Sequence, residues 1–488
     1  MHHLTLLLIL PIVGVLLLAL IPARRLRLIR GLALTVTGIE MIASWWLLRL
    51  FDSSDGGMQL LERVVWNPRL GTAYAVGIDG LSLPMVLLAT LLCFVAVLAS
   101  TGIQERARGY FGLLLMLESA MLGVFLAQDW SLFYIFWELT LIPLFFLIDR
   151  WGGVNRQGAA LNFVLYTMGG SVFMLISLLV LFDSVPGHSF AMADLTEGGR
   201  LLPADVQVLI FLGFLIGFGV KMPIFPLHGW LPLAHVEAPS PVSILLSGIL
   251  LKMGAYGLLR AAGTLPEAVL SLQGLLVSLA LVSLVYGGLL AWRQTDLKAM
   301  IAYSSVSHMG VVLLGIASLN LAGFTGAVMQ MVAHGLVAAA LFLLIGLLYE
   351  RTHTRNIEHY GSLVRITPRF AFFTIFAFVA AVGLPGTVGF VAELHALVGG
   401  FQRWGWLVVI LSFGVLISAA YAIRTVGRLF TGPVRPAMRE VEDLCGGETF
   451  AAGVLALGIL LLGIYPAPAL QLFTATVTEL AALFGGGS

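Results

Sequence analysis

Several ionisable side chains lie within long apolar stretches of this sequence. They are Glu138, Lys221, Lys252, His308, His334 and Glu393. A charged side chain at the centre of a bilayer costs roughly 2.5–3.5 kcal/mol on insertion scales, so sequences keep one where it meets a partner or water. Histidine titrates near neutral pH, and a lysine whose acidic partner can approach or retreat can bind and release a proton. In chain order, these residues suit a lateral proton relay through the plane of a membrane.

Each of these residues also has a structural interpretation. Glu138 and Lys221 form the natural pair of opposite charge, and such a pair could simply hold two helices together. His308 and His334 could be interhelical hydrogen-bonding residues, and Glu393, predicted at a helix end, could be hydrated. Two further acids, Glu40 and Glu118, also lie in apolar stretches. Glu118 fits either a functional or a structural interpretation, whereas a structural or peripheral role is favoured for Glu40.

The amino-acid composition indicates whether these residues lie in water or in a lipid bilayer. Of 488 residues, 59% are hydrophobic and 10% charged, where a soluble domain would have about a quarter charged. The net charge of +1 excludes a basic field for nucleic acid, and two cysteines exclude a disulfide framework or an iron–sulfur ligand set. No nucleotide-phosphate loop is present. The chain is therefore expected in a lipid bilayer, with no metal and no cofactor of its own.

Apolar runs long enough to cross a bilayer occur about fourteen times. They are continuous rather than alternating, which favours helices over a barrel. The predicted spans are 3–22, 28–50, 81–101, 110–127, 130–148, 160–182, 206–227, 239–262, 268–292, 300–318, 322–349, 370–392, 404–427 and 450–474.

The distribution of basic residues predicts the orientation. No Lys or Arg precedes the first apolar run, whereas Arg24, Arg25, Arg27 and Arg30 follow it, so it is read as a retained helix. Eighteen of the 26 Lys and Arg residues fall in loops after odd-numbered helices and six in the others. Cytoplasmic loops carry this excess, so the N-terminus is expected outside.

Two spans contain prolines in similar settings. Pro223 and Pro226 interrupt the seventh, and Pro385 interrupts the twelfth, 162 residues or five helices after Pro223. An odd number of helices inverts the second copy, so the pattern predicts two inverted five-helix repeats, each with a broken helix. The alternative is that Pro and Gly are merely common in membrane helices. The expected units are helices 1–3 (1–108), the first repeat (109–262), the second repeat (263–430), and an inner loop with helix 14 (431–488).

Combined motifs resemble the antiporter-like subunits of respiratory complex I. They are Gly219-Val-Lys-Met-Pro-Ile-Phe-Pro-Leu-His-Gly-Trp-Leu-Pro232, Leu250-Leu-Lys-Met-Gly254, Ala302-Tyr-Ser-Ser-Val-Ser-His-Met-Gly310, Phe136-Trp-Glu138 and Gly383-Leu-Pro-Gly386. Within that family, glutamate rather than lysine in the twelfth helix is M-type, which matches Glu393. The unextended C-terminus and Gly77-Ile-Asp79 also look M-like.

The resemblance implies roles and partners. Glu138 and Lys221 would be the coupling pair, Lys252 the central relay, His308 and His334 the intervening groups, and Glu393 the terminal acid. The chain would be a subunit of NADH:quinone oxidoreductase in a bacterial cytoplasmic membrane, beside L-type and N-type chains. FMN, iron–sulfur clusters and quinone would belong to partner subunits. The alternatives are a multi-subunit Na+/H+ antiporter, a related hydrogenase or ferredoxin-fed complex, and an inert scaffold.

Overall fold

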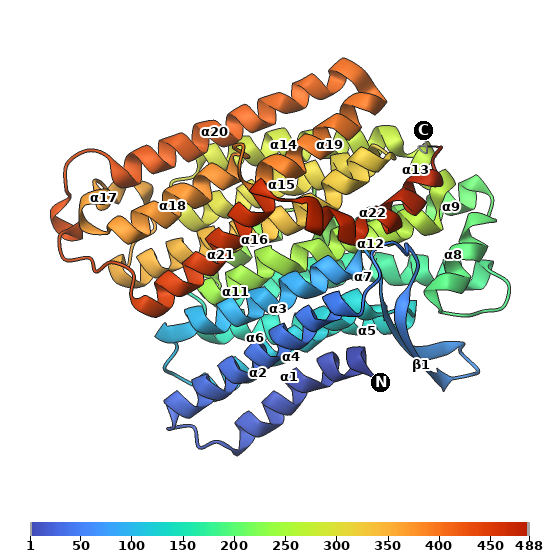
Figure 1. The fold of residues 1–488 in the computed structure, drawn as a ribbon, viewed down its shortest axis with the longest axis horizontal. Coiled ribbons are helices and arrows are strands. Elements are labelled where there is room, and N and C mark those ends of the chain that lie inside the picture. The colour runs from blue at the N-terminus through green and yellow to red at the C-terminus, as the bar shows by residue number, and fades with distance from the viewer. Residues whose placement is uncertain (1, 486–488) are drawn as a thin grey trace.

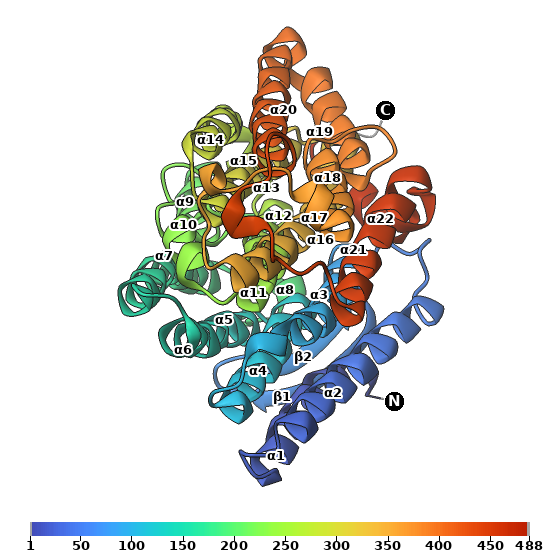
Figure 2. The same ribbon diagram turned by 90° about the vertical axis from the view of Figure 1, so that its left-hand side faces the viewer.

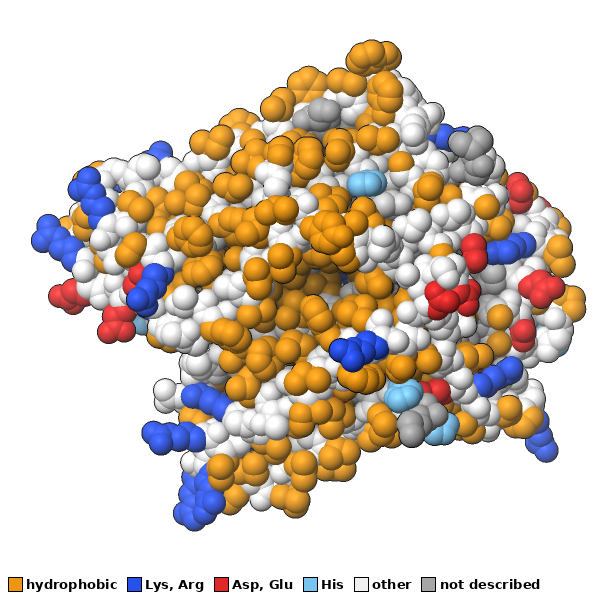
Figure 3. Space-filling view, viewed as in Figure 1, with side chains coloured by type: hydrophobic (Ala, Val, Ile, Leu, Met, Phe, Trp, Pro, Cys, Tyr) orange, Lys and Arg blue, Asp and Glu red, His pale blue; other side chains and the backbone are white. Residues whose placement is uncertain are grey.

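The chain folds into a bundle of long helices that run roughly side by side (Figure 1). This computed structural model describes residues 2–485. Hydrophobic side chains cover the middle of the bundle, and most charged ones gather toward its two ends (Figure 3). Within the described residues, 13 helices are long and apolar enough to cross a membrane. The predicted all-α, multi-pass membrane fold is therefore confirmed.

The crossings are single helices or helices joined end to end. In chain order they are α1 His3–Leu20, α2 Leu26–Trp46, α3 Ser82–Ala99, α4 Ala107–Leu126, α5 Trp130–Leu139 with α6 Leu141–Trp151, α7 Arg156–Ser184, α9 Ala204–Lys221, α11 Ser240–Leu245 with α12 Leu251–Thr264, α14 Gln273–Arg293, α15 Leu297–Ala317, α16 Leu321–Thr352, α18 Pro368–Ala381 with α19 Val388–Trp404, α20 Val409–Phe430 and α21 Gly446–Ile464. The shorter helices are α8 Met192–Arg200, α10 Trp230–Glu237, α13 Pro266–Ser271, α17 Leu363–Ile366 and α22 Ala467–Ala482.

The middle of the bundle is formed by α11, α12, α15 and α16, whose residues are almost all buried. Seen end on, α1 and α2 lie at one edge and α20 at the opposite edge (Figure 2). The peripheral helices keep one apolar face exposed, as expected of helices that contact lipid or another subunit. The central helices therefore provide the sites where ionisable side chains can be removed from lipid altogether.

Both proline-containing spans are broken, as predicted. The first ends as a helix at Lys221, passes Pro223 and Pro226, and continues as α10. The second ends at Ala381, turns through Gly383 and Gly386 with positive φ angles of 74° and 92°, and restarts at Val388. The predicted spans 206–227 and 370–392 both contain the break, but the second ends too early, because α19 continues to Trp404.

Two further differences come from segments that the span pattern did not separate. An antiparallel hairpin, β1 Gln59–Asn67 and β2 Thr72–Ile78, joins α2 to α3 at one end of the bundle. The predicted span 450–474 is two helices, since α21 ends at Ile464 and α22 begins after Pro466. Proline has no N–H to donate, so the α21 hydrogen-bond ladder cannot continue through this position.

A buried ion pair joins the hairpin to the central helices. Arg260 of α12 donates from both terminal nitrogens to Asp79, at 2.6 and 2.8 Å, and also to the Tyr256 hydroxyl at 2.9 Å. The Asp79 carboxylate also accepts the backbone N–H groups of Leu81 and Ser82, at the start of α3. One carboxylate thus holds together the end of β2, the first turn of α3 and α12.

We expect the replacement Arg260→Met to destabilise the chain by roughly 3–5 kcal/mol, because it leaves the Asp79 carboxylate buried and unpaired. The measurement is the free energy of unfolding in detergent micelles. Arg403→Met is the matched control, because Arg403 is an exposed arginine that bonds Gln273 and should change stability by no more than about 0.5 kcal/mol. Equal effects of the two variants would contradict the anchoring role of Arg260.

Candidate functional site

Lys221 is the last residue of α9 and lies at the break in the first repeat. Its side chain is buried, and its Nζ atom donates to the Thr140 hydroxyl at 3.0 Å. It also lies over the Trp137 ring, 5.0 Å from the centroid. Thr140 separates α5 from α6, so the lysine contacts the interruption in one span from the broken end of another.

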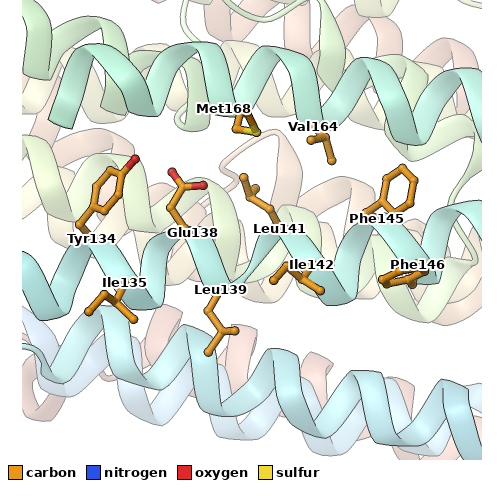
Figure 4. Close-up of a pocket in the computed structure, with 10 residues that line it drawn as sticks. All are labelled: Tyr134, Ile135, Glu138, Leu139, Leu141, Ile142, Phe145, Phe146, Val164 and Met168. Atoms are coloured by element: carbon orange, nitrogen blue, oxygen red, sulfur yellow. The ribbon is translucent and has the colours of Figure 1, made fainter. Parts of the chain in front are cut away.

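Glu138 lies between those two contact residues in sequence but faces elsewhere. It lines an open apolar groove of about 590 Å³ between α5–α6 and α7 and points toward Met168 (Figure 4). No ion pair within 4.0 Å joins Glu138 to Lys221 in the described part of the chain. The direct pair suggested by the sequence is therefore replaced by an indirect arrangement through Trp137 and Thr140.

Lys252 lies immediately after a wide helical turn. Residues Leu246–Leu250 form a π-helical turn between α11 and α12, a feature often found at functional sites. The Lys252 Nζ atom donates to the Ser247 carbonyl at 2.5 Å and lies 2.7 Å from His334 Nδ1 on α16. Lys252 is fully buried, so these two polar partners replace the water that it loses.

Glycines allow the lysine and the histidine to meet. A side chain at Gly335 would lie 3.0 Å from the Gly248 carbonyl, and one at Gly248 would overlap Leu92. Small residues let membrane helices approach closely. On the other side of Lys252, a side chain at Gly254 would lie 2.7 Å from the Met222 backbone nitrogen, next to Lys221. The two lysine-bearing segments are therefore packed against each other.

His308 continues the series on the far side of His334. The two imidazole rings have centroids 5.5 Å apart, and His308 Nδ1 lies 3.5 Å from Glu393 Oε1. The Gln330 side-chain nitrogen is 3.4 Å from the same ring nitrogen. The structure thus brings four predicted residues together in the order Lys252, His334, His308 and Glu393. The two histidines follow one another in the reverse of the predicted chain order, because His334, and not His308, contacts Lys252.

Glu393 does not end its helix, as the sequence suggested; it lies within α19, which begins at Val388 and continues to Trp404. Its carboxylate folds back onto the break, where a side chain at Gly383 would come within 2.5 Å of Oε2. Gly383 follows the end of α18 and stands two residues before Pro385, just as Lys221 stands two before Pro223. Both broken helices therefore hold an ionisable group at the break, supplied by the first half in one repeat and by the second half in the other.

Three contributing groups were not found from the sequence. The Thr140 hydroxyl accepts a hydrogen bond from Lys221, and the Ser247 carbonyl accepts one from Lys252. The Gln330 side-chain nitrogen lies 3.4 Å from His308 Nδ1. Gln330 carried a usable signal, because it is a polar residue one turn before His334 in an otherwise apolar run. The Ser247 carbonyl carried none, because its availability depends on the π-helical turn.

Comparisons with known proteins agree with this architecture. The family model described as "NADH:quinone oxidoreductase/Mrp antiporter, TM" matches residues 127–418. NAD(P)H-quinone oxidoreductase chain 4 2 of Thermosynechococcus vestitus is 40% identical, over 98% of this chain and 91% of the relative. NADH-quinone oxidoreductase subunit M of Rhodobacter capsulatus is 40% identical, over 92% of this chain and 90% of the relative. A chain of respiratory complex I from Thermus thermophilus superposes with a TM-score of 0.89 at 34% identity, covering 99% of this chain and all of that one.

The chain therefore belongs to the NADH:quinone oxidoreductase/Mrp antiporter family of membrane subunits. The two relatives are chain 4 and subunit M of quinone oxidoreductases, which agrees with the M-type resemblance. These comparisons concern whole chains, and the contacts between the ionisable residues are seen in the structure of this chain.

We expect Gly383→Ala to separate Glu393 from His308, because the added methyl group occupies the space of the carboxylate. Gly386→Ala is a matched control, since Gly386 also has a positive φ but has nothing within 4 Å of the added atom. Both variants bear backbone strain of about 1–2 kcal/mol. A structure of each should show the Glu393 side chain displaced in Gly383→Ala only, and displacement in both or in neither would contradict this assignment.

Proposed function

We propose that this chain translocates protons as the M-type membrane-arm subunit of NADH:quinone oxidoreductase. The observation that carries the proposal is the contact series Lys252–His334–His308–Glu393, buried in the centre of a chain of this family. Four ionisable groups at such spacing are costly in a bilayer unless the protein uses them.

Each step of the proposed transfer moves one proton between neighbouring groups. The Lys252 ammonium gives a proton to His334 Nδ1, the acceptor 2.7 Å away, and becomes a neutral amine. His334 Nε2, which has no hydrogen-bond partner among the described residues, then delivers a proton toward the His308 ring. His308 Nδ1 passes its proton to Glu393. Lys252 takes up its next proton from the side of Lys221, and both imidazole rings return to their starting tautomers before the next transfer.

The two remaining residues supply the coupling. Glu138 lines an open groove at the apolar surface, where a neighbouring subunit can pack close to its side chain. A change of charge at Glu138 acts on Lys221 through the intervening Trp137 and Thr140, and Lys221 in turn acts on the segment that carries Lys252. Reduction of quinone in a partner subunit would provide the original change of charge.

The assembly follows from the same proposal. L-type and N-type chains would be the neighbours, and FMN, iron–sulfur clusters and quinone would be held by other subunits. The membrane would be the bacterial cytoplasmic membrane, with the N-terminus outside and the arginine-rich helix ends inside. A Na+/H+ exchange subunit is the second candidate, because the family description also includes Mrp antiporters. The names of the quinone oxidoreductase relatives support the redox-driven complex.

We expect Lys221→Ala and Lys252→Ala each to lower proton pumping coupled to quinone reduction about tenfold or more, which corresponds to a barrier higher by at least ~1.4 kcal/mol. Pumping is measured in vesicles that contain the assembled complex, with assembly checked on native gels. Arg403→Gln, an exposed substitution remote from the series, is the control.

An assembled complex with either lysine removed and with unchanged pumping would refute the proposed series. Loss of Na+/H+ exchange without loss of quinone-linked pumping would favour the antiporter candidate instead.

A further inference from the structure

An open cavity lies between α14 and α20, near the end of the bundle at which both helices end. Its volume is about 720 Å³, and it is lined by Leu289, Trp292 and Arg293 of α14 and by Arg424 of α20. Basic side chains gather on the surface toward this end of the bundle, where α20 ends at the left (Figure 1, Figure 3). The cavity thus combines two arginines with two large apolar side chains.

The position of the cavity follows from the packing of the two helices. They touch where Gly288 faces α20, since a side chain at Gly288 would come within 2.9 Å of Ile417. Trp292 follows Gly288 by about one turn, and Arg424 follows Ile417 by about two. The cavity therefore lies beyond this contact, toward the ends of both helices.

Arg424 is held against the end of α14. Its Nη1 atom donates to the Trp292 carbonyl and, at 3.5 Å, to the Gln294 carbonyl. The last carbonyls of a helix lack partners within it, and a cation is favourable at this end of the helix dipole. These bonds use one of the three guanidinium nitrogens, so the other two remain available to a ligand next to Arg293.

The two arginines carry positive charge that no acid in the structure balances. Within the described part of the chain, neither Arg293 nor Arg424 has a carboxylate within 4.0 Å. Asp296, the acid that follows Arg293 most closely in sequence, is paired with Arg355 at 2.9 Å. Guanidinium groups bind phosphate through paired hydrogen bonds, so two of them beside one cavity favour a phosphate ligand.

An apolar strip continues from the cavity along α14. Val282, Tyr286 and Leu289 are exposed and follow one another at helical spacing, on a helix long and apolar enough to cross a membrane. Val282 lies roughly 16 Å along the helix from Arg293, which is about half the thickness of the hydrocarbon core. Trp292 lies between the strip and the arginines, as is typical of tryptophan at a membrane–water interface.

We infer that this cavity binds an anionic phospholipid, with its phosphate on Arg293 and Arg424 and an acyl chain along Leu289 and Tyr286. Basic pockets between membrane helices are known to bind anionic lipid head groups. A free phosphate ion would use the arginines but not the apolar strip, so the strip favours a lipid. The inference goes beyond the proposed function, because it assigns a ligand that the proton series does not need.

The test is native mass spectrometry of the full chain in detergent micelles, titrated with phosphatidylglycerol or with phosphatidylcholine, whose head group has a phosphate but no net charge. We expect phosphatidylglycerol to bind more tightly than phosphatidylcholine. Arg293→Gln should weaken the binding of phosphatidylglycerol about fivefold, the factor that corresponds to one basic side chain near an anionic lipid surface. Arg293 forms no ion pair among the described residues, so this variant is expected to fold.

Arg27→Gln is the matched control. Arg27 is an exposed arginine in the first turn of α2, which begins at the same end of the bundle (Figure 1), and its replacement makes the same change of net charge. Equal weakening by Arg293→Gln and Arg27→Gln would mean a general attraction of the lipid to this end, and would overturn the site. Equal binding of the two lipids would overturn it as well. Displacement of phosphatidylglycerol by an equal concentration of glycerol 3-phosphate would indicate a site for free phosphate and overturn the lipid assignment.

A second measurement uses the assembled complex in vesicles that contain lipids with brominated acyl chains, which quench nearby tryptophan fluorescence. The chain has ten tryptophans, so the part due to Trp292 is the difference between the wild type and Trp292→Phe. Brominated phosphatidylglycerol should quench this part more strongly than brominated phosphatidylcholine does. Equal quenching by the two lipids would mean that another subunit covers the cavity in the complex, and would overturn the inference.

Discussion

The interior of a membrane protein must replace the hydration of every charged side chain that it takes out of water, and this requirement organises the molecule. The Lys221 ammonium contacts the Thr140 hydroxyl and the face of the Trp137 ring. The Lys252 ammonium contacts the Ser247 carbonyl and the His334 imidazole. Each lysine therefore lies where a helix is interrupted or widened. Regular α-helices offer no free backbone groups for this purpose, since their carbonyls are already bonded within the helix.

The two broken helices solve this problem in different ways. In the first, the lysine is the final residue before the break. In the second, Gly383 occupies the position two residues before the proline, and the acid is carried on the next half-helix and folds back to the same place. The architecture is thus similar in the two halves although the sequences of the breaks are not superimposable. An ionisable side chain can therefore reach the break of its helix either from the residue just before the break or from the half-helix that follows it.

Most residues of the site could be predicted from their residue types. The contacts between them could not be predicted. Lysines, histidines and acids in apolar runs are conspicuous, and Lys252, His308, His334 and Glu393 were all found in this way. The contact between Lys252 and His334 depends on the approach of Gly248 to Gly335, between residues far apart in sequence.

Glu138 shows the opposite case. Its charge and its place near Lys221 in the expected bundle suggested a direct pair, but the Thr140 interruption turns the lysine toward the residues on either side of the glutamate. The glutamate is left facing a surface groove. The prolines identified the broken helices correctly, while the boundaries were misplaced because the hydropathy of the chain does not change at a break. The hairpin was missed because its two strands, Gln59–Asn67 and Thr72–Ile78, are apolar runs too short to count as membrane spans.

The π-helical turn before Lys252 has a consequence for the length of this helix. It accommodates one residue more than a regular turn, so the residues on its two sides are rotated by about 100° relative to a continuous α-helix. Winding the same residues as a regular α-helix would therefore turn Lys252 away from His334, although no side chain of the site would be lost. The face on which Lys252 lies is set by the wide turn together with the number of residues in it, independently of composition.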